Sequence, residues 1–346
     1  MTRVNVFITV DIEPSIGGAF RNPNLRPVGT EKRIYGRVGN RYYGIPLIMD
    51  IADQYNIPLT FFVEVLNKYF FGEEETKEVC QYIISRGHDV QLHLHPNYLN
   101  FLKADRQKLH FSDNISDYNF RSQVDLIREG KDLLLGYGVR SAVAFRAGNY
   151  GANGDTIKAL RQNAFLIDSS YNLGNPRCTK IVGRKINDVT NLGGVWEFPI
   201  TCFIESVPFR QKRFKPLDIN GVSFQEIESV LNKAHLNGPQ NITIILHSFS
   251  FLNTYDLQYA KVKPRWTVIE RFKKLCQFLS KKSSAFEPKT LGNFGRNGLF
   301  EISLKSRNFF PHVSTVLSLS RGIGQLWDYL LCGRSPFTPL RNAHPS

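Results

Sequence analysis

Apolar positions follow two different periods along most of the chain. Short runs rich in β-branched and aromatic residues, such as 4–12, 58–64 and 89–95, predict buried strands. Longer segments between them, such as 120–138, carry apolar residues three and four positions apart and predict amphipathic helices. Several of these segments close on glycine, which is typical of a helix end.

The predicted strands and helices alternate. Further strands are predicted over 141–148, 165–171, 194–200 and 241–251, and helices over 45–56, 75–87, 120–138, 153–164, 223–238 and 266–282. Repeated strand–helix units indicate an α/β fold with a parallel sheet. About seven such units in fewer than about 300 residues favour one barrel over two separate domains. We therefore predict a barrel over residues 1–295 and a C-terminal extension over residues 296–346.

Two segments depart from this alternation. The loop 14–44 contains one acid, Glu31, and interleaved aromatic residues, and a loop of this length is usually functional or disordered. Its cations are Arg21, Arg26, Lys32, Arg33, Arg37 and Arg41. The basic extension places a set of apolar residues near one helical face, which predicts a helix docked on the barrel or lying on a membrane surface. These residues are Val316, Ile323, Leu326, Trp327, Leu330 and Leu331.

Composition and charge restrict the classes of partner and the cellular compartment that we expect. The chain of 346 residues has a net charge of +14, which favours anionic glycans, lipids or nucleic acid, but it contains no nucleic-acid-binding module. Its five cysteines form no CxxC pair or disulfide framework, which favours a reducing compartment. The N-terminus has no secretory pattern, and no apolar run is long enough to span a membrane. We expect a cytoplasmic protein, with peripheral contact at the inner membrane as a further expectation.

Ionisable residues occur where four predicted strands end. Asp11 and Glu13 end the first strand, His93 and His95 another, and Arg146 and His247 follow two more. Because the C-terminal ends of parallel strands meet at one edge of a barrel, these groups are expected to share a pocket. Each alone has an ordinary interpretation: a solvated strand end for the acids, a surface arginine, or a buried structural histidine. In a pocket, the positive charge of Arg146 would favour the carboxylate form of Asp11.

The order of these motifs resembles the polysaccharide deacetylase family with the NodB-type fold. The stretches that carry the resemblance are TVDIE, GHDVQLHLHP, FRAGNYG, DSSY, WEFP and IILH, between about residues 4 and 294. The resemblance implies a distorted (β/α)7-type barrel that removes an acyl group, usually N-acetyl, from a sugar. It also implies a divalent metal, with zinc the first expectation, and a sugar or polysaccharide substrate.

The resemblance assigns roles residue by residue. Asp11 matches the general base, Arg146 the arginine that orients it, and His247 the general acid. Asp168 lies where an acid supporting that histidine is expected, which is a looser match. Glu13 and His93 match metal ligands, although one residue is inserted before Glu13 and glutamate replaces aspartate. Backbone N–H groups near Asn149 and Tyr150 are expected to help hold an oxyanion.

The second histidine of the family's H-x-x-x-H motif is missing here. The position holds Asn97, whose amide oxygen is a weaker zinc ligand than imidazole. Three outcomes are open: His95 completes the site, Asn97 and water hold a harder or more weakly bound metal, or the metal site is degraded. The corresponding functions are a deacetylase or a catalytically impaired relative that binds an anionic glycan or lipid-linked sugar. A hydrolase acting on a non-sugar amide is a third alternative, because fold does not choose between substrates.

Overall fold

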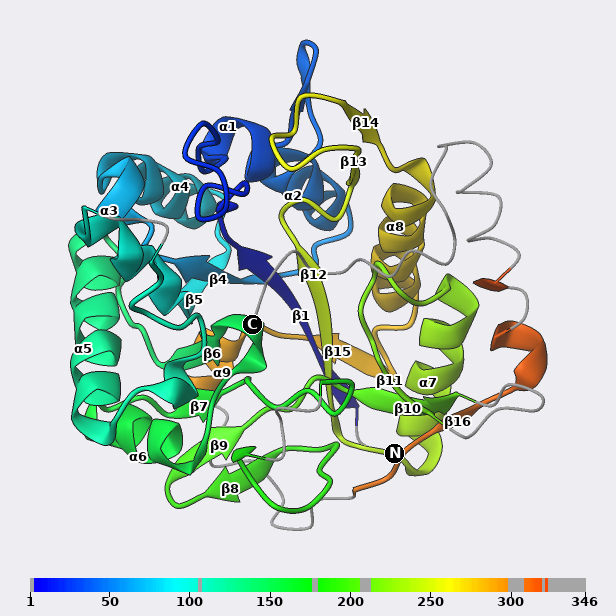
Figure 1. Ribbon diagram of the computed structural model, residues 1–346. Coiled ribbons are helices and arrows are strands. Elements are labelled where there is room, and N and C mark those ends of the chain that lie inside the picture. Colours follow the sequence, from blue (N-terminus) through cyan, green and yellow to red (C-terminus); the bar gives the residue numbers. More distant parts are fainter. Residues whose placement is uncertain are drawn as a thin grey trace.

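A curled, mostly parallel sheet forms the centre of the molecule, and helices surround it (Figure 1). The computed structural model describes residues 3–104, 108–175, 180–205, 213–297, 308–318 and 321–322. In spatial order the strands of the main path are β12 (Asn241–His247), β1 (Val4–Ile12), β4 (Thr60–Glu64), β5 (Asp89–Leu94), β6 (Ala144–Ala147), β7 (Ile167–Asp168), β9 (Val195–Glu197) and β8 (Thr190–Leu192). β8 runs antiparallel to β9, while the other neighbours on this path are parallel.

The sheet curls into a distorted barrel that is bridged by irregular chain. Beyond β9, the backbone N–H of Thr201 donates to the carbonyl of Thr243 in β12 (3.1 Å). The N–H of Ile219 likewise donates to the carbonyl of Ile245 (3.0 Å). These bonds connect the two ends of the strand path without a continuous ladder between the described strands. The predicted α/β fold with a distorted barrel is confirmed, and β15 (Phe286–Pro288) additionally pairs with the start of β1.

The main helices pack an apolar face against the sheet and expose a polar face. They are α2 (Ile45–Gln54), α4 (Glu74–Ser85), α5 (Phe120–Gly136), α6 (Gly154–Gln162), α7 (Phe224–Asn237) and α8 (Trp266–Lys281). Capping boxes begin α6 at Asn153 and α7 at Ser223, where the side chains satisfy backbone N–H groups that have no partner within the helix. Each of the six helices predicted from apolar spacing is present, with ends that differ by at most two residues.

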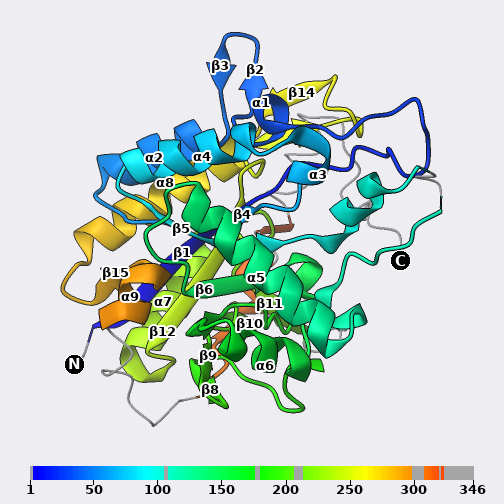
Figure 2. The same cartoon turned by 90° about the vertical axis from the view of Figure 1, so that its left-hand side faces the viewer.

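Several short elements were not predicted from the sequence. The loop 14–44 contains α1 (Thr30–Arg33) and a hairpin of β2 (Arg37–Val38) and β3 (Arg41–Tyr42). Figure 2 shows this hairpin projecting from one end of the molecule. A second hairpin joins β13 (Leu252–Thr254) to β14 (Val262–Pro264), α3 covers Lys68–Phe71 and α9 covers Leu291–Asn297. These strands have two or three residues each, too few for an alternating pattern to identify them.

The part of the C-terminal extension that the structure describes packs against the barrel. Its strand β16 (His312–Val313) pairs with β10 (Cys202–Glu205), which also pairs with β11 (Arg213–Pro216). Arg321 forms an ion pair with the buried carboxylate of Glu226 in α7 (3.0 Å). The predicted apolar helical face beyond Val316 falls on residues outside the described ranges. Within the described residues, no helix is long and apolar enough to cross a membrane.

Gly130→Ala is expected to destabilise the protein, although alanine is the better helix former. A Cβ atom at Gly130 would lie 2.8 Å from a methyl group of Leu92 and 3.0 Å from one of Leu94, both buried in β5. Overpacking of this kind costs about 1–3 kcal/mol, more than the roughly 1 kcal/mol gained in helix propensity. Gly136→Ala is the matched control, because a Cβ atom there meets nothing within 4 Å. Urea unfolding should show opposite signs for the two variants, and stabilisation by both would contradict this packing of α5 on β5.

Candidate active site

The C-terminal ends of four parallel strands bring the predicted ionisable groups together. Asp11 of β1 is in register with His247 of β12, and His93 of β5 is in register with Arg146 of β6. Glu13 lies just past the end of β1. The shared edge predicted from the sequence is therefore present, and it carries two neighbouring clusters.

The first cluster is centred on the guanidinium of Arg146, which is completely buried. Its Nη1 donates to Asp11 Oδ1 (2.5 Å), and its Nη2 donates to the hydroxyls of Thr9 (3.0 Å) and Ser169 (2.9 Å). The guanidinium also lies 4.2 Å from the centre of the Phe62 ring. A buried charge is tolerated when it is paired and its donors are satisfied, and both conditions hold here. One carboxylate oxygen of Asp11 is thereby fixed.

The other carboxylate oxygen of Asp11 faces His247. Asp11 Oδ2 lies 3.9 Å from His247 Nε2, beyond hydrogen-bond distance but close enough for a small molecule to contact both. The His247 side chain is 25% exposed, whereas that of Asp11 is 4% exposed. His247 Nδ1 has no hydrogen-bond partner among the described residues. The carboxylate of Asp11 and the partly exposed imidazole of His247 thus face each other.

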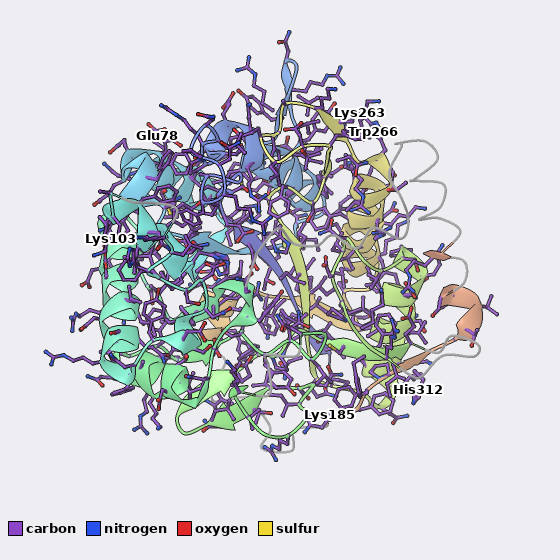
Figure 3. All side chains as sticks on the ribbon, in the orientation of Figure 1. Glu78, Lys103, Lys185, Lys263, Trp266 and His312 are labelled. Atoms are coloured by element: carbon purple, nitrogen blue, oxygen red, sulfur yellow. The ribbon has the colours of Figure 1, made fainter. Side chains whose placement is uncertain are left out.

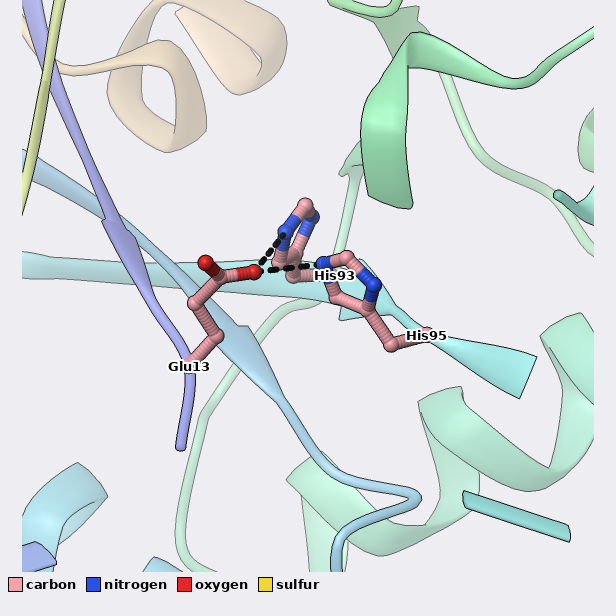
Figure 4. Close-up of side chains that lie close together, drawn as sticks. All are labelled: Glu13, His93 and His95. Atoms are coloured by element: carbon pink, nitrogen blue, oxygen red, sulfur yellow. Dashed lines mark ion pairs between the residues drawn. The ribbon is translucent and has the colours of Figure 1, made fainter. Parts of the chain in front are cut away.

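The second cluster consists of Glu13, His93 and His95. Glu13 Oε2 lies 2.5 Å from His95 Nε2 and 3.7 Å from His93 Nε2. One possible ligand atom from each residue falls within 4.8 Å of the others. Figure 4 shows the carboxylate of Glu13, just past the end of β1, pointing toward the imidazole rings of His93 on β5 and of His95 directly after β5. All three residues are buried.

Hydrogen bonds to the outer ring nitrogens orient both imidazoles. His93 Nδ1 donates to the carbonyl of Arg146 (2.8 Å), and His95 Nδ1 donates to the carboxylate of Asp113 (2.9 Å). These bonds direct Nε2 of each ring toward Glu13. Metal-binding histidines commonly have such a partner, because it fixes the ring and makes the free nitrogen a stronger ligand.

Charges around Glu13 favour its ionised form. Burial alone would raise the pKa of Glu13, but His95, His93 and Arg33 outweigh burial and hold this pKa well below its usual range. Burial would likewise lower the pKa of His95, but Asp113 and Glu13 raise it well above the usual range. Arg33 Nη2 contacts Glu13 Oε1 at 2.9 Å, which leaves Oε2 to face the histidines. A positive species, a proton or a metal cation, is therefore stabilised between these side chains.

Asn97 lies on the 3-10 helix that follows β5 at Pro96–Leu102. No described hydrogen bond joins its side chain to Glu13, His93 or His95, and its Oδ1 is buried without a partner. The structure thus brings His95 to Glu13, while a ligand role for Asn97 remains a prediction. Its orphaned oxygen makes it a fourth candidate donor.

Glu64, at the end of β4, holds the backbone beside the histidine cluster through hydrogen bonds. This fully buried carboxylate accepts the backbone N–H of His95, Leu66 and Asn67. Burial raises the pKa of Glu64 to about 7, although His95 and His93 act in the opposite direction. By holding the backbone at His95, Glu64 fixes the place where the chain leaves β5.

Asp168 pairs with another acid, Glu197. The two residues are in register on β7 and β9, and both are fully buried. One carboxyl oxygen of each, Asp168 Oδ2 and Glu197 Oε2, is buried without another hydrogen-bond partner among the described residues, and burial, reinforced by Asp168, raises the pKa of Glu197 well above its usual range. Burial also raises the pKa of Asp168. Glu197 therefore keeps a proton and donates it to Asp168, and no described hydrogen bond or ion pair joins Asp168 to His247.

The backbone beside the site is strained at Asn149 and Tyr150. Their φ angles of 53° and 55° lie in the left-handed region, which residues other than glycine seldom adopt. The Asn149 side chain donates to Asp113 (2.6 Å), which in turn orients His95. The predicted role of this backbone in holding an oxyanion remains a prediction.

Four residues of the site were not identified in the sequence: Arg33, Glu64, Asp113 and Glu197. A signal existed for Glu64 and Glu197, because each is an acid that ends an apolar strand. Arg33 was one of several cations in a long loop, and Asp113 lies in a polar segment without a pattern. Nothing in the sequence distinguished these two from their neighbours.

Comparison with solved structures gives several matches to the fold. A 4-α-glucanotransferase from Thermococcus litoralis is 11% identical, with a TM-score of 0.52, over 96% of this chain and 46% of that protein. A family 4 carbohydrate esterase from Streptomyces lividans is 11% identical, with a TM-score of 0.43, over 90% of this chain and 100% of that one. The Bc1960 peptidoglycan N-acetylglucosamine deacetylase is 16% identical, with a TM-score of 0.42, over 84% and 88% of the chains.

These structural neighbours include polysaccharide deacetylases, the family that the sequence motifs resemble. At identities of 9–16%, the likeness concerns the fold and says nothing of the reaction. No protein-family model and no curated protein sequence matches the chain. Function must therefore be argued from the site itself.

Glu197→Gln is expected to stabilise the protein increasingly as pH rises. Native Glu197 keeps a proton that an unfolded glutamate releases near pH 4.3, approximately. The stability that this protonated form contributes is complete below about pH 4.3 and is lost as pH rises through the raised native pKa. A glutamine amide donates the same hydrogen bond without a proton to keep. The unfolding free energy of the variant relative to wild type should therefore grow by up to about 1.4 kcal/mol per pH unit.

Urea unfolding at several pH values between about pH 5 and pH 8 checks this prediction. Glu270→Gln is the matched control, because Glu270 is exposed on α8 and should show no such trend. A Glu197→Gln effect that does not change with pH would contradict a shared proton between Glu197 and Asp168.

Proposed function

We propose that the protein is a metal-dependent hydrolase that removes an N-acetyl or O-acetyl group from a sugar or polysaccharide precursor. The observation that carries this proposal is the adjacency of the two clusters. A carboxylate and two imidazoles converge beside a buried Asp11–Arg146 pair that faces His247. Such an arrangement supplies a metal site, a base and an acid at one edge of the barrel, as acyl transfer to water requires.

The donor set fits a divalent metal. One carboxylate oxygen and two imidazole nitrogens are ligands that zinc accepts, and three protein ligands leave a coordination position open for water or substrate. The contact of 2.5 Å between Glu13 Oε2 and His95 Nε2 places a proton between them, and a bound metal cation would replace that proton. We assign Glu13, His93 and His95 as ligands, with Asn97 as an additional candidate. When bound, the metal would lower the pKa of water and polarise the acyl carbonyl.

Asp11 is the general base in this proposal. Arg146 fixes Asp11 Oδ1, so Oδ2 remains free to accept a proton from the attacking water. The Asp11 carboxylate cannot turn away, because Arg146 is itself held by Thr9 and Ser169. A base that is already held in its orientation lowers the entropic cost of reaching the reactive geometry.

His247 is the general acid. Its Nε2 lies on the open side of Asp11, and its exposed edge can reach a leaving amine or hydroxyl. Protonation of the leaving group prevents expulsion of an unstable anion. The supporting acid predicted for His247 was Asp168, which accepts a hydrogen bond from Ser170 and is in register with Glu197. We therefore propose that Asp168 and Glu197 together stabilise the interior of the barrel near Arg146.

The finer aspects of the function are also proposals. An acidic or lipid-linked sugar fits the net charge of +14, and the amide rather than ester bond follows from the family resemblance. A cytoplasmic location, a role in polysaccharide biosynthesis and zinc as the metal stay predictions of the sequence. Release of acetate from a panel of N-acetylated and O-acetylated sugars identifies the bond.

Asp11→Asn and His247→Ala are each expected to lower kcat by about 10²–10⁴-fold, because each removes one proton-transfer group. Asparagine keeps the shape of Asp11 and an oxygen that accepts from Arg146, although it removes the charge that pairs with this guanidinium, and His247 is partly exposed. Both variants should therefore fold, the asparagine variant with lower stability. Acetate release measures activity, and far-ultraviolet circular dichroism checks the fold. Exposed His312 provides a control, because His312→Ala should retain wild-type activity. Full activity in both site variants would refute the proposed mechanism.

Metal content should depend on His93 and His95. Elemental analysis of the purified wild-type protein is expected to give close to one divalent metal per chain, and His93→Ala and His95→Ala should each lose it. Asn97→Ala tests the remaining candidate, with little loss expected. Asp113→Asn should weaken the metal by about 10–100-fold, because it removes the partner that orients His95.

Other results would change the assignment in defined ways. Loss of metal in Asn97→Ala but not in His95→Ala would restore the ligand set predicted from the family. A wild-type protein that takes up no metal after incubation with zinc would contradict the hydrolase and favour a sugar-binding relative.

A further inference from the structure

Two segments rise from the C-terminal edge of the barrel and form one wall beside the site, which we call the rim. The rim consists of residues 14–44, which follow β1, and residues 252–266, which follow β12. Because β1 and β12 are paired neighbours, the two segments start side by side. The side-chain amide of Gln258 joins them by donating to the carbonyls of Gly17 (2.5 Å) and Arg26 (2.8 Å).

The rim projects outward at its β2–β3 hairpin. Figures 1 and 2 both show this hairpin standing beyond the helices, with the β13–β14 hairpin next to it. Arg37, Arg41 and Tyr42 on the hairpin are exposed, the last to 44%. A projecting surface of this shape suits a flat partner better than a single glycan chain, which binds in a concave site.

The rim is strongly cationic. Its exposed cations are Arg21, Arg26, Lys32, Arg37, Arg41, Lys261 and Lys263. Its acids are Glu31 and Asp256, and both are engaged. Glu31 pairs with Arg37 (3.0 Å), and Asp256 accepts backbone N–H groups of Gln258, Ala260 and Lys261. Seven exposed cations against two acids leave the rim with a net positive charge.

Large apolar side chains are exposed among these cations. Tyr255 is 38% exposed, Leu257 47% and Trp266 57%, in addition to Tyr42. Trp266 packs edge-on against Tyr43, with ring centres 5.9 Å apart, which joins the start of α8 to the hairpin. Figure 3 shows Lys263 and Trp266 close together at the same margin of the molecule. Exposed aromatic and cationic side chains on one projecting surface are unusual unless a partner covers them.

We propose that the rim binds the anionic surface of a lipid bilayer. Lysine and arginine attract anionic headgroups, tryptophan and tyrosine favour the headgroup region, and Leu257 adds apolar area for shallow insertion. An anionic bilayer surface accounts for the positive charge, the exposed apolar residues and the projection of the rim together. A soluble acidic glycan would explain the charge but not the exposed Leu257 at a convex edge.

This contact would place the site close to the membrane. Arg33 belongs to the rim and contacts the carboxylate of Glu13, so the rim and the candidate metal site are directly joined. Where the proposed hydrolase function holds, its substrate is a lipid-linked sugar presented at the bilayer surface. Membrane binding itself does not depend on that function, because it uses none of the acid, base or ligand side chains.

Co-sedimentation of the full chain with vesicles tests the proposal. Wild type should bind vesicles of phosphatidylglycerol and phosphatidylcholine, release them at high salt, and fail to bind pure phosphatidylcholine. Replacement of Arg37, Arg41, Lys261 and Lys263 by glutamine should weaken binding by at least about 30-fold.

The matched control removes the same charge from elsewhere on the surface. Lys273, Lys274 and Lys281 are exposed on α8, which begins at the rim and runs away from it, and exposed Lys282 follows its last residue. Their replacement by glutamine should change binding by less than about 3-fold. Trp266→Ala together with Leu257→Ala should also weaken binding, by about 10-fold or more, with net charge unchanged.

Specific outcomes would overturn the proposal. Absence of wild-type binding to acidic vesicles at low salt would do so, as would equal losses in the rim and control quadruple variants, which would indicate net charge alone. A rim variant that loses binding to soluble polygalacturonate but retains vesicle binding would assign the rim to an acidic glycan. Asp11→Asn should bind vesicles as wild type does, so failure of the proposed hydrolase is distinguishable from failure of membrane binding.

Discussion

The buried guanidinium of Arg146 is the constraint on which the candidate site depends. A cation without solvent contact requires partners from several directions, and the barrel supplies them from different strands. Arg146 binds Asp11 and Thr9 on β1 and Ser169 beyond β7, while its own carbonyl orients His93 on β5. The base and one imidazole of the second cluster are therefore positioned by the same residue. A shift of β6 would disturb both clusters, because Arg146 contacts a residue of each. The two clusters therefore depend on the same rigid edge of the barrel.

The sequence predicted this edge well because strand ends are a simple signal. An apolar run that stops at an ionisable residue marks both the strand and the side chain, as with Asp11, His93 and His247. The neighbours of Glu13 were less predictable. Family spacing designates Asn97, which lies on the 3-10 helix after β5 and whose role as a ligand stays a prediction. His93 and His95 are two residues apart, and the period of a strand places such a pair on one face. That physical rule, rather than motif counting, identifies the second imidazole beside Glu13.

Residues that reach the site from other segments could not be predicted in this way. Arg33 and Asp113 lie on irregular chain far from Glu13 and His95 in sequence, and only the fold brings them together. The Asp168–Glu197 pair depends on β7 lying next to β9 while β8 lies outside. Strand order of this kind is a property of the whole sheet. Local apolar spacing predicted the helices and most strands of the barrel, but it contains no information about which strands become neighbours.

Arg33 connects the two halves of the structure that matter for function. Its guanidinium contacts the carboxylate of Glu13 (2.9 Å), the hydroxyl of Tyr259 (2.5 Å) and, at 3.7 Å, the face of the Phe249 ring. Phe249 in turn packs against His247, with ring centres 5.0 Å apart. One cation thus joins a candidate metal ligand, the rim and the residue next to the proposed general acid. Because Arg33 contacts the rim, Glu13 and Phe249 together, a movement of the rim away from the barrel would break some of these contacts. A partner that holds the rim in place therefore also keeps Glu13 Oε2 toward the histidines and Phe249 against His247. The rim and the groups proposed to act on a substrate are in this way held in one geometry.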